Sequence, residues 1–340
     1  MMSTKTINRS RGARMSLTRG GMLWGVMHNS ARHSRVGGLG DSAITASENS
    51  ERRHVMRSRV LGVLLSAVAL LAVDVNPVSA AQHLTFSSID VPGAMFTNIH
   101  GMSPTGDVIG EFTSVDGVRH GFLLHDDVFT TIDYPGSIFT NANGINPSGA
   151  IVGSYKSSDR KKHGFLLRKG KFTTIDIPGA ILTLPTGINP SGVVVGAYDS
   201  PDGTRHAFVL DGGQVTTIDY PGSDLTWAFG VNPQGDIVGL YMDAAGNFHS
   251  FLRTKAAISS IAVPGAIETD AFGINASNEI VGSYISADGV EHGFVLKSGS
   301  VTTVDFPGST DTIVFAITPN GGIGGLYADT SGNGHGWSST

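Results

Sequence analysis

The sequence repeats with a constant period of 43 residues. Asp-x-Pro-Gly begins at Asp90, Asp133, Asp176, Asp219 and Asp305, and Ala262 stands where the remaining copy would have its Asp. A histidine recurs at the same interval, at His120, His163, His206, His249, His292 and His335. Six copies without an insertion or deletion between them indicate an array of supersecondary units that bury their faces against one another.

Three turn signals divide each copy into four short segments. In the third copy the first signal is Asn189-Pro190-Ser191-Gly192, where Pro presets the backbone for the second position of a type I turn. The others are Asp202-Gly203 and Gly212-Gly213, dipeptides that tolerate a positive φ. The segments between the turns are about 4–6 residues long, the usual length of a β-strand. Each copy is therefore predicted to be a four-stranded antiparallel sheet.

A repeat of about 40–45 residues with four antiparallel strands is typical of a β-propeller blade. The array begins with a lone fourth strand, Leu84 to Asp90, and ends after only three strands, near Trp337. We therefore expect an all-β, six-bladed propeller over residues 83–340, in which the N-terminal strand completes the last blade. This closure hides a sheet edge that would otherwise pair with another chain, so a monomer is expected.

The third and fourth strands of each blade form a hairpin that places the repeated histidine opposite the repeated acid. Taking Lys169-Gly170 as a two-residue turn puts His163 opposite Asp176. Directly opposed side chains lie about 5 Å apart at Cβ, so the imidazole can donate to the carboxylate. The same count pairs His120 with Asp133, His206 with Asp219 and His292 with Asp305.

An Asp–His pair is part of a catalytic triad, but symmetric copies favour a structural tie, because an active site needs one asymmetric constellation. We therefore predict no catalytic residue and no cofactor, and we expect His249, opposite Ala262, to find another partner. Asp199 and Asp202 are spaced loosely like calcium ligands. Nearby loops lack the acids that a repeated calcium site needs, so no metal site is predicted.

A segment of different composition precedes the array. It opens with Arg57 and Arg59, continues with an apolar stretch from Val60 to Val73, and ends with Val78-Ser79-Ala80. This order is typical of a secretory signal peptide, which we assign to residues 56–80. The apolar stretch is shorter than the roughly 20 residues of a transmembrane helix, so no stable membrane span is expected in the mature protein.

The predicted location is the periplasm or the cell exterior, with an uncleaved N-terminal anchor as the alternative. A signal peptide normally begins near the initiator methionine. Residues 1–55 are therefore interpreted as a misassigned start, with translation beginning at Met56 or a nearby Met, or as a disordered extension.

Residues 81–340 contain 12 Lys and Arg and 24 Asp and Glu, a formal net charge of −12. Because phosphate contacts supply most of the affinity for nucleic acid, an acidic body of this kind is not expected to bind it. The one basic cluster is Arg160-Lys161-Lys162, near Arg168, Lys169 and Lys171. We interpret it as solvated loop charge, with a docking point for an acidic polymer as the alternative.

Strand direction assigns the turns to two faces of the ring. The Asp-Gly loops and the Pro-Gly connections share one face, and the Asn-Pro-x-Gly and x-Gly turns share the other. The first face has the longer and more varied loops, which is where specificity resides in repeat proteins. We predict ligand-binding residues there, namely Phe96, Phe139, Trp227, Arg160 and Lys161.

The repeated motifs resemble a known bacterial family. They are His206-Ala207-Phe208, with His-Gly-Phe in other copies, Gly-Ile-Asn-Pro-Ser-Gly and Ile-Val-Gly-x-Tyr, and they resemble the "probable extracellular repeat, HAF family" over all six copies. His249-Ser250-Phe251 and His335-Gly336-Trp337 depart mildly from the pattern. The resemblance implies an exported bacterial protein and implies no reaction.

Two classes of function remain open. The first is an exported, non-catalytic binding or scaffold module whose ligand is a glycan or another protein. The alternative is a carbohydrate-active propeller enzyme, a hydrolase or a lyase. The fold alone supports neither, but the symmetric repeats favour the binding module.

Mature protein recovered from a bacterial periplasm or culture medium should begin close to Ala81, because the small residues before it form the cleavage site. N-terminal sequencing or mass spectrometry reads that end directly. A soluble cytoplasmic form that keeps residues 1–80 would contradict both the signal peptide and the predicted location.

Overall fold

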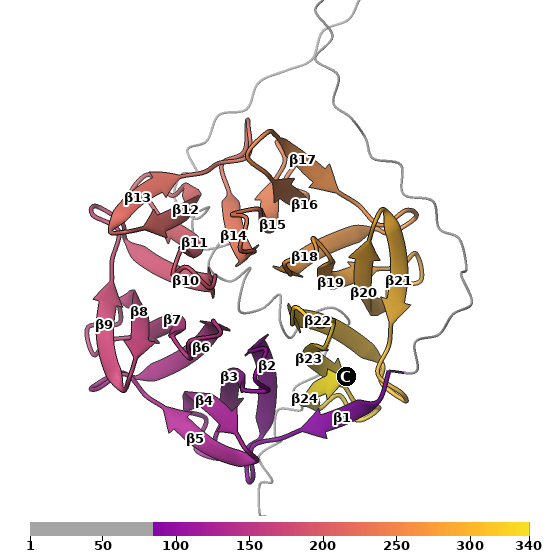
Figure 1. The fold of residues 1–340 in the computed structure, drawn as a ribbon, viewed down its shortest axis with the longest axis horizontal. Helices are drawn as coiled ribbons and strands as arrows, with labels where there is room; N and C mark the ends of the chain where they lie inside the picture. The colour runs from indigo at the N-terminus through magenta and orange to yellow at the C-terminus, as the bar shows by residue number, and fades with distance from the viewer. Residues whose placement is uncertain (1–83, 340) are drawn as a thin grey trace, which may run out of the picture. The chain divides into compact units, whose positions relative to one another are not determined.

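The computed structural model describes residues 84–339, which form a six-bladed β-propeller (Figure 1). Each blade is a four-stranded antiparallel sheet, as the repeat predicts. The predicted signal peptide and the extension before it lie outside the described residues. No helix among residues 84–339 has the length and apolar character needed to cross a bilayer.

The strands of each blade follow the chain from the central channel outward, except in the last blade. Blades 1 to 3 are β2 (Phe96–Met102), β3 (Val108–Thr113), β4 (Arg119–His125), β5 (Val128–Ile132); β6 (Phe139–Ile145), β7 (Ile151–Lys156), β8 (Lys162–Arg168), β9 (Lys171–Ile175); and β10 (Leu182–Ile188), β11 (Val194–Asp199), β12 (Arg205–Asp211), β13 (Gln214–Thr217). Blades 4 to 6 are β14 (Thr226–Val231), β15 (Ile237–Met242), β16 (Phe248–Arg253), β17 (Ile258–Ile261); β18 (Glu268–Ile274), β19 (Ile280–Ile285), β20 (Glu291–Lys297), β21 (Ser300–Val304); and β22 (Asp311–Ile317), β23 (Ile323–Ala328), β24 (Gly334–Ser339), β1 (Phe86–Ile89).

The predicted closure of the ring by the N-terminal strand is confirmed. In Figure 1, β1 at the start of the propeller lies beside β24 at its end, and the two strands pair from Phe86 with Ser339 to Ile89 with Gly336. The Phe86 ring lies 5.4 Å from the ring of Trp337, which is fully buried. Strand pairing and apolar packing thus join the two ends of the array.

The hydrophobic core lies between the blades. One cluster combines Val195 and Ala207 of blade 3 with Ala228 and Phe251 of blade 4, and the other blades pack in the same way. The third strand of every blade contributes one fully buried aromatic ring, at Phe122, Phe165, Phe208, Phe251, Phe294 and Trp337. The repeat therefore buries both faces of each sheet against its neighbours.

The glycine of Ile-Val-Gly makes room for this ring. At Gly153, a Cβ atom would lie 2.0 Å from the carbonyl oxygen of Asn141 and 2.8 Å from the Phe165 ring. Real Cβ atoms do not approach so closely, so no other residue fits without moving the inner strand. This position fixes how close β6 lies to the rest of its blade.

Deleting residues 84–90 should leave β24 as an unpaired edge and remove the Phe86 contact with Trp337. We expect loss of a single cooperative unfolding transition and dimerisation or aggregation through the exposed edge. Thermal unfolding and size-exclusion chromatography measure both effects. A deletion variant that stays monomeric with an unchanged Tm would show that the closure contributes no stability.

Candidate functional site

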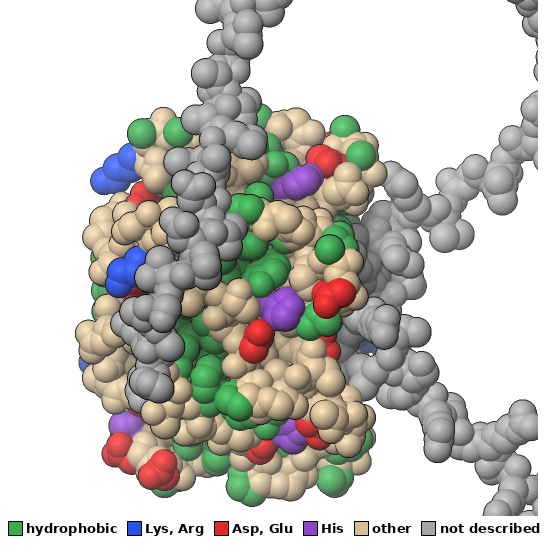
Figure 2. Space-filling view, turned by 90° about the vertical axis from the view of Figure 1, so that its right-hand side faces the viewer, with side chains coloured by type: hydrophobic (Ala, Val, Ile, Leu, Met, Phe, Trp, Pro, Cys, Tyr) green, Lys and Arg blue, Asp and Glu red, His purple; other side chains and the backbone are tan. Residues whose placement is uncertain are grey.

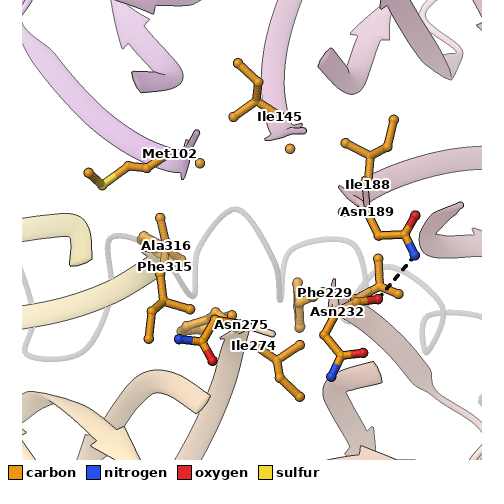
Figure 3. A pocket seen from close by; sticks show the side chains of 18 of the residues that line it. Met102, Ile145, Ile188, Asn189, Phe229, Asn232, Ile274, Asn275, Phe315 and Ala316 are labelled. Atoms are coloured by element: carbon orange, nitrogen blue, oxygen red, sulfur yellow. Dashed lines mark hydrogen bonds between the residues drawn. The ribbon is translucent and has the colours of Figure 1, made fainter. Parts of the chain in front are cut away.

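A pocket of about 140 Å³ occupies the central channel at the end where the inner strands terminate (Figure 3). Its wall is built from the last residues of β2, β6, β10, β14, β18 and β22 and from the turns that follow them, which read Asn-Pro-x-Gly in blades 2, 3 and 4. All six blades therefore contribute to one site.

A β-bulge turns one residue of each inner strand out of the sheet register. In β6, for example, Ala142 pairs with Gly153 and Gly144 pairs with Val152, so Asn143 has no opposite residue. The same shift occurs in the other inner strands. The six bulged residues line the pocket, and they are His100, Asn143, Thr186, Phe229, Phe272 and Phe315.

His100, Asn143 and Thr186 form a polar arc on one side of the pocket. Each is tied to a backbone carbonyl of the next blade. His100 Nδ1 lies 3.1 Å from Ala142 O, the Asn143 amide donates to Pro185 O at 2.8 Å, and the Thr186 hydroxyl donates to Ala228 O at 2.7 Å. These bonds hold the polar arc in place before any ligand arrives.

The same bonds decide which atoms remain for a ligand. A carbonyl only accepts, so His100 carries its proton on Nδ1, and its Nε2 accepts from the Asn98 amide at 2.8 Å. One N–H of the Asn143 amide and the hydroxyl hydrogen of Thr186 are likewise used. The amide oxygen of Asn143 and the lone pairs of Thr186 Oγ1 are left to accept hydrogen bonds.

Phe229, Phe272 and Phe315 form an aromatic arc on the other side. The rings of Phe229 and Phe272 lie 5.3 Å apart, and those of Phe272 and Phe315 lie 4.8 Å apart. The Phe315 ring also meets the His100 imidazole edge to face, at 5.7 Å, where the two arcs join. Figure 3 shows the aliphatic side chains that continue the wall, among them Met102, Ile145 and Ile188.

Asparagines at the rim connect successive blades. The Asn146 amide donates to Asn189 O at 3.1 Å, the Asn189 amide donates to Asn232 O at 3.2 Å (Figure 3), and Asn275 donates to Thr318 O at 3.3 Å. Each asparagine oxygen also accepts a backbone N–H of its own turn, as Asn189 does from Val193 at 3.0 Å. These residues therefore hold the rim in shape.

The residues that sequence reasoning selected lie at the other end of the channel. Phe96 and Phe139 begin β2 and β6, and Trp227 is the second residue of β14. None of the three lines the pocket. Their role in binding stays a prediction, and the pocket itself was missed. Aligning the repeats would have shown that the position before Gly-Ile-Asn is the one that changes from polar to aromatic.

The five residues predicted to bind a ligand differ in exposure and in the charged groups near them. Arg160 and Lys161 are exposed in the loop after β7, and Lys161 lies 3.8 Å from Asp159. Phe139 has two cations at 6.0 Å from its ring centre, Arg119 and Lys162. The Trp227 ring lies beneath the guanidinium of Arg205, at 4.6 Å.

The histidine–aspartate pairs lie on the outer side of the ring, where Figure 2 shows histidine beside acidic side chains. Four Nδ1-to-carboxylate distances are 3.0 Å for His120 and Asp133, 2.9 Å for His163 and Asp176, 2.8 Å for His206 and Asp219, and 3.0 Å for His292 and Asp305. A fifth pair, His335 and Asp90 at 3.1 Å, joins the first and last strands. The pairs are thus part of a repeated contact.

Each of these histidines also stacks on an aromatic residue of the second strand, as His163 does on Tyr155 at 5.2 Å. His249, which faces Ala262, keeps its contact with Tyr241 and bonds Asp243 through Nε2 at 2.9 Å. Another carboxylate thus replaces the missing one.

Carboxyl groups gather in blade 5, at the channel end opposite the pocket. Burial raises the pKa of Glu268 to about 7, and the nearby Glu291 adds to this shift. Burial also raises the pKa of Glu291 to about 7 and holds the pKa of Asp270 well above its usual range. The two ends of the channel therefore differ, since the pocket is lined by only one ionisable side chain, His100, among the described residues.

Comparison with known proteins identifies the fold and no family. No family model and no curated protein matches the sequence. Among solved structures, TolB from Acinetobacter baumannii is similar with a TM-score of 0.52 and 15% identity, covering 74% of this chain and 65% of its own. Two structures of the Aleuria aurantia lectin, one described as a six-bladed β-propeller and one in complex with Fucalpha1-6GlcNAc, have TM-scores of 0.45 and 0.47 at 13% identity. The similarity covers 74% and 72% of this chain, respectively, and 93% of each lectin chain.

Replacing His206 or Asp219 by Ala should lower the free energy of unfolding by about 0.5–1.5 kcal/mol, the net value of a hydrogen bond whose groups are partly exposed. The equivalent changes at His163 and His292 should have similar effects in chemical denaturation. Ala262→Asp should change stability little, because His249 already has Asp243. Loss of a binding activity in one His–Asp variant alone, at unchanged stability, would contradict a purely structural role.

Proposed function

We propose that this chain is a binding module whose central pocket takes a small uncharged ligand with one apolar face and one hydroxyl-bearing edge, such as the terminal sugar ring of a glycan. The observation that carries the proposal is the break in the sixfold pattern. Blades 1 to 3 supply the polar arc and blades 4 to 6 supply the aromatic arc.

The chemistry of the two arcs matches the two sides of a sugar ring. Aromatic rings supply a large apolar surface for C–H groups. The acceptors on Asn143 and Thr186, already fixed by bonds to the next blade, are placed for hydroxyl donors. Binding sites are commonly mostly apolar with a few oriented polar groups, and this pocket has that composition.

The volume of the pocket and the charge of its lining further restrict the kinds of ligand that fit. A pocket of about 140 Å³ is smaller than the roughly 300–1,000 Å³ of typical sites for drug-sized molecules, so one ring rather than a chain is expected inside it. No carboxylate or ammonium group lines it among the described residues, which favours an uncharged ligand. Glycoside hydrolysis commonly needs a pair of carboxyl groups at the ligand, and for this reason binding is proposed rather than cleavage.

The site of action that we propose is outside the cytoplasm. The supporting observations are the signal-like residues 57–80 and the resemblance of the repeats to the HAF family of extracellular repeats. The formal charge of −12 over residues 81–340 does not attract anionic polymers, and no Asp, Glu, Lys or Arg within residues 84–339 lines the pocket.

Screening the purified protein on a glycan array, followed by calorimetric titration with the selected monosaccharide, tests the proposal. Phe272→Ala should weaken binding by about tenfold or more, because it removes the centre of the aromatic arc. Thr186→Val keeps the shape, removes the hydroxyl, and should weaken binding by a similar factor.

Phe129→Ala serves as the matched control, since it removes a phenylalanine from the outer strand β5 and should leave affinity unchanged. Circular dichroism establishes that each variant is folded. The proposal fails if the wild type binds no uncharged sugar, or if the three variants bind it with equal affinity. Binding of a peptide alone would assign the pocket to a protein ligand.

A further inference from the structure

The first residue of the third strand is cationic in three consecutive blades and neutral or acidic in the other three. In blades 1 to 3 it is Arg119, Lys162 and Arg205, and in blades 4 to 6 it is Phe248, Glu291 and Gly334. These residues lie at the channel end opposite the pocket, near the start of the inner strands. We propose that the cationic half is a binding site for an oxyanion, a carboxylate or sulfate group on a ligand, centred on Lys162 and Lys156.

The two arginines already have carboxylate partners within the protein. Arg205 donates to Asp199 through Nε at 2.6 Å and through Nη2 at 2.9 Å, and Arg119 lies 3.3 Å from Glu111. Asp199 is directly opposite Arg205 in the register of β11 and β12. Blade 3 thus contains its own anion at this level.

At the position where blade 3 has Asp199, blade 2 has Lys156. Lys156 is directly opposite Lys162 in the register of β7 and β8, at the place that Asp199 occupies one repeat later. Like charges directly opposed across two strands destabilise a sheet. An oxyanion bound between the two ammonium groups would supply the negative charge that Asp199 supplies in blade 3.

Lys162 has no carboxylate within ion-pairing distance among the described residues. The Lys162 Nζ atom lies 6.0 Å from the centre of the Phe139 ring, and the Arg119 guanidinium lies at the same distance from that centre. Burial has the largest effect and lowers the pKa of the Lys162 ammonium. The positive charges of Arg205, Lys156 and Arg119 lower it further, and the negative charge of Asp199 partly opposes them. A partly buried cation among other cations is costly to keep, and an anionic ligand would relieve that cost.

The opposite half of the same channel end carries carboxyl groups, which repel anions when they are ionised. Glu268 and Glu291 in blade 5 and Asp311 in blade 6 occupy the equivalent ends of their strands. An anionic ligand is therefore directed to blades 1 to 3. The residues of the basic cluster Arg160-Lys161-Lys162 differ in exposure. Arg160 and Lys161 are exposed in the loop, whereas Lys162 is partly buried. This site is independent of the pocket proposed for an uncharged ligand.

Thermal unfolding of the purified protein in sodium sulfate, compared with sodium chloride at equal ionic strength, tests the site. Sulfate should raise the Tm of the wild type in a saturable manner, as expected for a ligand that binds only the folded state. Lys162→Met should abolish the sulfate-specific shift and should raise the Tm in chloride, because an uncompensated cation is replaced by an apolar side chain of similar length. Lys162→Arg should keep the shift.

Lys171→Met is the matched control, since Lys171 is an exposed lysine of the same blade, and it should respond to sulfate as the wild type does. Calorimetric titration with D-glucuronate and D-glucose then distinguishes a carboxylate from the sugar that carries it, with a loss of at least tenfold in glucuronate affinity expected for Lys162→Met. The proposal is overturned if Lys162→Met and Lys171→Met respond equally to sulfate. It is also overturned if Lys162→Met lowers the Tm in chloride, which would make the ammonium a structural group.

Discussion

Each blade has two apolar faces, and within residues 84–339 each face is covered by the neighbouring blade. The clusters that form the core therefore span two blades, as Ile109 and Ile132 of blade 1 pack with Ala142 and Phe165 of blade 2. A blade alone would leave both faces in water. The stability of the fold consequently depends on a closed ring, and Ile89 of β1 supports it by packing with Ile99 and Phe122 of blade 1. This dependence explains why the packing residues vary so little between repeats.

The bulge in each inner strand frees one residue from that constraint. Its neighbours in the strand stay packed between blades, whereas its side chain lines the channel and contacts the neighbouring blades only at the channel wall. The bulged position can thus be His100, Asn143 or Thr186 in one half of the ring and phenylalanine in the other without loss of blade packing. Six repeats of one scaffold in this way produce one asymmetric pocket.

The charged groups at the channel end opposite the pocket lower the stability of the folded protein, whereas the repeated apolar contacts between blades raise it. The pair Lys156 and Lys162, the half-buried carboxyl group of Glu268 and the buried one of Asp270 lower stability unless a ligand or a proton neutralises them. Inter-blade packing supplies the stability that tolerates such residues. Sites that bind ligands are often where a protein keeps groups that do not favour its own folding.

The sequence by itself determined the number of blades, the strand order, the closure by the first strand and the register that brings His163 to Asp176. These features depend on a strict period and on tight turns, and both are local properties of the chain. Four features emerged only from the tertiary structure. They are the bulges, the contact of His100 with Phe315, the bond from His249 to Asp243, and the pairing of Lys156 with Lys162 where blade 3 pairs Asp199 with Arg205. They join residues of different blades or depend on one extra residue in a strand pair, and neither the spacing nor the composition of a single repeat specifies where those groups meet once the ring has closed.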